Sequence, residues 1–76
     1  MTDTLLFEYE VKKSGKTMKA ICKALGMGTT SLWSKVHNVT EFKASEIDGI
    51  KRFCGWSNDT RDKIFFSQKG ENNSSS

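Results

Sequence analysis

The sequence lacks a long apolar run. With 76 residues and no proline, it contains no stretch near the roughly 18 consecutive apolar residues that cross a bilayer. The apolar segment Leu5 to Phe7 is too short for the core of a signal peptide, and no basic segment precedes it. These absences predict a cytoplasmic protein without a membrane partner. A chain of this length holds one domain at most, with little room for a deep cleft.

Cysteine and histidine are scarce. The cysteines are Cys22 and Cys54, and the single histidine is His37. A structural zinc site takes about four such ligands, so no metal is expected. Each cysteine falls on the apolar face of a predicted helix, where a free thiol behaves as a small hydrophobic group. We therefore expect two reduced cysteines in the core. His37 lies at a predicted helix C-terminus, where its imidazole can donate a hydrogen bond to a phosphate.

The sequence also lacks catalytic motifs. It has no paired carboxylates, no glycine-rich phosphate loop and no metal-ligand spacing, and no serine or cysteine stands in an evident relation to His37. We expect no enzymatic activity, no cofactor and no small-molecule substrate.

Acidic residues are absent from one long segment. Residues 1–10 hold three acids and no base, residues 11–40 hold six lysines and no acid, and residues 41–76 hold six of each sign. A contiguous segment of one sign favours a polyanionic partner such as nucleic acid or an anionic surface. A solvated, lysine-rich face is the alternative, and charge alone does not separate the two.

Apolar periodicity and end signals predict an all-α chain of five helices. Thr17 is a candidate N-cap, Gly26 ends the second helix at a position suited to positive φ, and Asn38 ends the third. Residues 67–76, SQKGENNSSS, have the composition of a disordered tail. The expected helices cover about residues 4–13, 17–25, 28–36, 44–54 and 57–64.

Several apolar side chains have predicted places. We expect Tyr9 and Trp56 in the core. Trp33 is expected to be partly buried against the loop that leads to Phe42, with an exposed partner-binding anchor as the alternative. The segment Ile64-Phe65-Phe66 either closes the core or packs against a second subunit.

The second and third predicted helices, joined by a short glycine-containing turn, have the layout of a helix-turn-helix. The segment TMKAICKALGMGTTSLWSKVHN resembles the helix-turn-helix of phage Cro and CI-type regulators, the XRE group. The resemblance continues through EFKASEIDGIKRFCG and RDKIFF and is strongest for small phage-encoded members with Leu-Trp in the recognition helix. It implies a compact five-helix, lambda-repressor-like DNA-binding domain over residues 1–66 that binds double-stranded operator DNA, usually as a homodimer, in the host-cell cytoplasm.

This resemblance implies which residues meet DNA, with the third helix in the major groove. The residues implied to face bases are Thr29, Thr30, Ser34 and Lys35. Those implied to face phosphates are Lys16, Thr17, Lys19, Asn38 and Lys43. Gly28 departs from the family pattern because serine or threonine usually caps the recognition helix, and Asn38 departs because glycine usually follows it.

The base-facing set lacks the Arg, Gln and Asn side chains that make bidentate contacts with bases. Two functions therefore stay open. The first is a Cro-like or repressor-type transcriptional regulator that binds operator DNA. The second is an antirepressor, or modulator of repression, that acts by binding a phage repressor protein.

Overall fold

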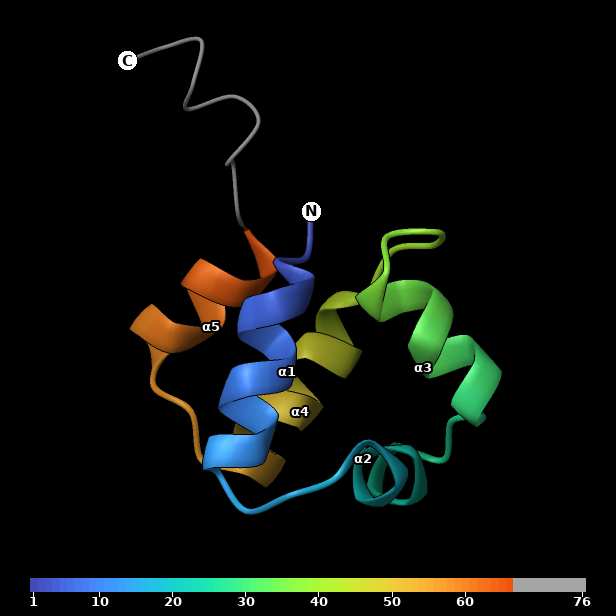
Figure 1. The fold of residues 1–76 in the computed structure, drawn as a ribbon, viewed down its shortest axis with the longest axis horizontal. Coiled ribbons are helices and arrows are strands. Elements are labelled where there is room, and N and C mark those ends of the chain that lie inside the picture. The colour runs from blue at the N-terminus through green and yellow to red at the C-terminus, as the bar shows by residue number, and fades with distance from the viewer. Residues whose placement is uncertain (67–76) are drawn as a thin grey trace, which may run out of the picture.

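The computed structural model describes residues 1–66, which form five helices and no strand (Figure 1). The all-α prediction is confirmed, and each helix begins and ends within one residue of its expected limits. The expected tail, residues 67–76, lies outside the described residues. The helices are α1 (Thr4–Lys13), α2 (Met18–Leu25), α3 (Thr29–Val36), α4 (Ala44–Cys54) and α5 (Asn58–Phe65).

Local capping residues determine where α2 and α3 begin and end. The Thr17 hydroxyl accepts a hydrogen bond of 3.0 Å from the Ala20 amide and so begins α2. Gly26 ends α2 with φ 68°, in the left-handed region that favours glycine. α3 follows after the short turn 26–28. Asn38 stands just beyond α3 with φ 65°, as its residue type predicts.

Every helix contributes to one apolar core. Phe7 lies within it, and the ring centroids of Phe42, Trp56 and Phe65 are 5.9, 5.9 and 5.8 Å from its own. Such aromatic pairs stabilise a core beyond the area that they bury. The two cysteines are free and buried, as predicted. The buried apolar residues are Phe7, Val11, Ile21, Cys22, Leu32, Val36, Ile50, Cys54, Trp56, Ile64 and Phe65.

The packing leaves one face of α3 open. In Figure 1, α1 lies in front of α4, with α5 on one side of this pair and α3 on the other. α2 packs against both α3 and α4, while α5 packs against α1 and α4. α3 therefore lies at the edge of the bundle, far from α5.

The N-terminal residues fasten the end of α3. The Asn38 side chain accepts from the Thr2 amide at 2.8 Å and donates to the Thr2 carbonyl at 2.9 Å. The Thr4 hydroxyl donates to the Val36 carbonyl at 2.7 Å. The Asp3 amide donates to the Ile64 carbonyl at 2.7 Å, so the same segment also contacts the end of α5.

Two of the three predictions for aromatic side chains are wrong. Tyr9 is 59% exposed, because Phe7 and Val11 take the inward positions of α1. Trp33 is 57% exposed and stacks on the His37 ring, so the exposed alternative holds in place of burial against the loop. Trp56 is buried, as predicted.

Among residues 1–66, no helix has the length and apolar character needed to cross a membrane.

Candidate nucleic-acid interface

The open face of α3 carries small hydroxyl side chains. Leu32 and Val36 are each 2% exposed and hold the opposite face against the core. Thr30 and Ser31 are exposed, and Ser34 is partly exposed. Ser31 was not among the predicted site residues, although it lies three residues before Ser34, a spacing that places both side chains on one face of the helix. This face can donate and accept single hydrogen bonds.

A shallow hollow between α2 and α3 brings together three predicted site residues. Thr17, Lys19 and Thr29 all line it, and its volume is about 600 Å³. Lys23, another lysine of the acid-free segment, also lines the hollow. The lining also includes the apolar Ala20, Cys22 and Met27. Two lysines on such a surface favour an anion such as a backbone phosphate.

The N-terminus of α3 borders this hollow. Its N-cap, Gly28, lines the hollow and has no side chain to accept a hydrogen bond from the first amides of the helix. These amides carry the positive end of the helix dipole, which favours anions. The helix start therefore adds to the positive potential of Lys19 and Lys23.

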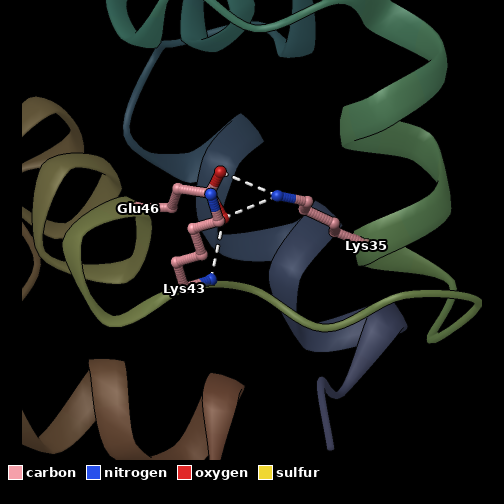
Figure 2. A network of polar contacts seen from close by, with 3 residues as sticks. All are labelled: Lys35, Lys43 and Glu46. Carbon is pink, nitrogen blue, oxygen red and sulfur yellow. Dashed lines mark hydrogen bonds and ion pairs between the residues drawn. The ribbon is translucent and has the colours of Figure 1, made fainter.

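Lys35 points away from the open face, contrary to the expectation that it faces bases. Its Nζ lies 2.7 Å from both carboxylate oxygens of Glu46 on α4 (Figure 2). The two side chains are only 13% and 18% exposed. Because a mostly buried charge needs a partner, the ammonium is held toward α4 instead of solvent.

Glu46 also organises the start of α4. Its Oε1 accepts a hydrogen bond of 2.8 Å from the backbone amide of Lys43, the N-cap residue of that helix (Figure 2). Burial by itself raises the pKa of the Glu46 carboxyl, but the hydrogen bonds from Lys35 and Lys43, together with their positive charges, outweigh burial and lower the pKa below its ordinary value.

The remaining residues predicted to face phosphates are spread apart. The Lys16 ammonium lies 4.9 Å from the centroid of the Phe53 ring, in a cation–π contact, and its side chain is partly buried. Asn38 is exposed, but its amide is bound to Thr2, which corrects the expectation that this amide is free for phosphate. Lys43 is exposed at the start of α4.

An aromatic pair lies on one flank of α3. The ring centroids of Trp33 and His37 are 4.2 Å apart with an interplanar angle of 21°, and the His37 Nδ1 lies 2.9 Å from the Trp33 carbonyl oxygen. Trp33, His37 and Leu32 line a small, mostly apolar hollow of about 230 Å³ that also reaches Met18 and Glu8. An exposed tryptophan beside an apolar hollow suits a partner surface with apolar side chains.

Within residues 1–66, no group of three or more His, Cys, Asp or Glu side chains is placed to hold a metal ion. No protein-family model, curated protein or solved structure matches the chain. Its function must therefore be inferred from its own residues and their geometry.

Proposed function

We propose that this protein is a phage-type transcriptional regulator, Cro-like or repressor-like, that binds operator DNA. In this proposal the fold is a helix-turn-helix of the lambda-repressor-like type, with α2 as the supporting helix and α3 as the recognition helix. The protein acts in the cytoplasm of the host cell, and two copies bind paired half-sites.

The observation that carries the proposal is the meeting of three features at one edge of the bundle. The exposed hydroxyl face of α3 adjoins the hollow that contains Lys19, Lys23 and the uncapped start of α3. A major groove about 12 Å wide admits one helix, and phosphates on its rim would then meet the lysines. Hydroxyls at the bases and cations at the backbone are a division of contacts that protein–DNA interfaces use.

The exposed Trp33 supports a second candidate function. Tryptophan is enriched among the residues that dominate the binding energy of protein interfaces, and this one is 57% exposed on α3. The hydroxyl face beside it offers no bidentate base contact. An antirepressor that keeps this fold and binds a phage repressor protein through the Trp33 flank of α3 would use both features.

A paired binding experiment separates the two functions. Gel shifts are measured with duplex DNA from the protein's own genetic neighbourhood, with and without the neighbouring repressor, and a pull-down of that repressor is run in parallel. The first function predicts a shift by this protein alone that the Lys19→Ala/Lys23→Ala variant weakens. A stable complex with the repressor and no shift without it would instead assign the protein to the second function.

A further inference from the structure

Glu46 connects the two elements that border the proposed interface. Its carboxylate binds Lys35 of α3 through both oxygens and the amide of Lys43 at the start of α4 through one of them (Figure 2). The ion pair Asp48–Arg52 differs in kind, since both residues belong to α4 and their side chains are 77% exposed for Arg52 and 52% for Asp48. Exposed pairs of that type contribute little to stability.

A partly buried contact through both oxygens of the carboxylate restrains direction as well as distance. The Lys35 ammonium has three donors, and the carboxylate accepts at both of its oxygens. α3 has only eight residues and sits at the edge of the bundle, so contacts from neighbouring elements determine its orientation. Leu32 and Val36 hold its inner side, and the Lys35 contact fixes the flank that faces α4.

We propose that Glu46 is a positioning residue of the DNA interface, which orients α3 through Lys35 relative to the start of α4 without touching DNA. This inference rests on the proposed function. It assigns Lys35 an indirect role, in place of the direct base or phosphate contact that the sequence resemblance implies.

If Glu46 positions α3, replacing it should change DNA affinity in the direction opposite to the one that charge alone predicts. Replacing Glu46 with Gln removes a negative charge near a polyanion, so charge alone would strengthen DNA binding. Loss of the restraint on α3 should instead weaken binding to the preferred duplex by about tenfold, as expected for weakening one charged hydrogen-bonded contact. Asp48→Asn is the matched control, because it removes the same charge from an exposed position of the same helix. It should bind at least as tightly as the wild type.

A double-mutant cycle tests the path of the effect. Lys35→Met, Glu46→Gln and the double variant are compared for binding to the duplex that the wild type prefers and to a random-sequence duplex. If Lys35 acts through Glu46, the double variant should lose about tenfold, no more than the single variants do. If the affinity losses of the two single variants instead multiply, so that the double variant loses about a hundredfold, Lys35 contacts DNA directly and the positioning role is overturned.

Amide hydrogen exchange gives a readout that needs no DNA. Exchange in α3 should quicken in Glu46→Gln, relative to Asp48→Asn, while exchange at Ile50 in the middle of α4 stays the same. Unchanged exchange in α3 overturns the inference whatever the binding data show. If the wild type shifts no duplex, the proposed function fails and the DNA role of Glu46 fails with it. If the wild type binds and Glu46→Gln binds equally well, only the role of Glu46 fails.

Discussion

Glu46 illustrates how one residue links protonation to stability. Its pKa is lowered in the folded protein, so the ionised carboxylate stabilises the fold above the unfolded pKa of about 4.3, and this contribution is lost as pH falls through the lower folded pKa. We predict that the stability difference between wild type and Glu46→Gln is largest near neutral pH and shrinks below about pH 4. Thermal unfolding between pH 7 and pH 3 measures it. Asp48→Asn should show a smaller change, and an equal deficit for Glu46→Gln at both ends of the range would contradict the prediction.

Thr30 and Ser31 test the recognition role of single side chains on α3. Both are exposed, so Thr30→Ala and Ser31→Ala should change the free energy of unfolding by less than about 0.5 kcal/mol. If the face reads DNA, each change should cost on the order of 1 kcal/mol of binding, confined to particular base pairs. Leu32→Ala is the contrasting variant, since a cavity at this buried site should cost about 2 to 5 kcal/mol of stability and reduce every activity. DNA binding that survives both hydroxyl deletions on all sequences tested would remove the recognition-helix assignment.

At the scale of helices, local signals predict the boundaries well. Thr17 and Gly26 act through atoms within a few residues of themselves, so the sequence nearby is sufficient to identify them. The turn between α2 and α3 and the inward positions of Leu32 and Val36 follow from the same local pattern.

The orientation of flanking side chains was not predictable in this way. Lys35 turns toward α4 because Glu46, eleven residues later, lies beside it in the fold. Trp33 was assigned to the wrong surroundings, because periodicity gives a side chain's direction on its helix but not the element that it meets. The lysines also lie differently from the expectation: Lys19 and Lys23 share the hollow between α2 and α3, while Lys35 pairs with Glu46.

The hollow between α2 and α3 gives a prediction about salt. If Lys19 and Lys23 neutralise phosphates, changing either to alanine should weaken binding to all duplexes alike and reduce the slope of log K against log salt by about one. Lys63→Ala is the control, because Lys63 pairs with Asp59 on α5, across the bundle from α3 (Figure 1). Binding titrations between 50 and 200 mM salt, about the range over which the effect is strong, measure the slope. Slopes that stay the same for Lys19→Ala and Lys23→Ala would exclude the phosphate role.

At the scale of the whole molecule, an apolar surface is exposed beside the C-terminal end of α5. Ile64 and Phe65 are buried, which confirms that this segment helps to close the core, but Phe66 is 56% exposed. Phe66, Phe42 and Ile47 together line two adjoining hollows of about 420 and 450 Å³. A projecting ring beside an apolar hollow on one surface can pair with a second copy through a two-fold axis.

Under the proposed function, a single α3 would offer few base contacts, so paired half-sites would have to supply affinity. We predict that Phe66→Ser shifts the protein from dimer toward monomer, with little loss of monomer stability because the ring is exposed. Sedimentation over a range of concentrations measures the association. Leu5→Ser, at a 75% exposed position of α1, is the control and should leave association unchanged. DNA binding by Phe66→Ser should lose its cooperativity while the salt slope per bound copy is kept. A wild type that sediments as a monomer throughout, or a Phe66→Ser variant that associates as the wild type does, would place the dimer contact elsewhere or exclude it.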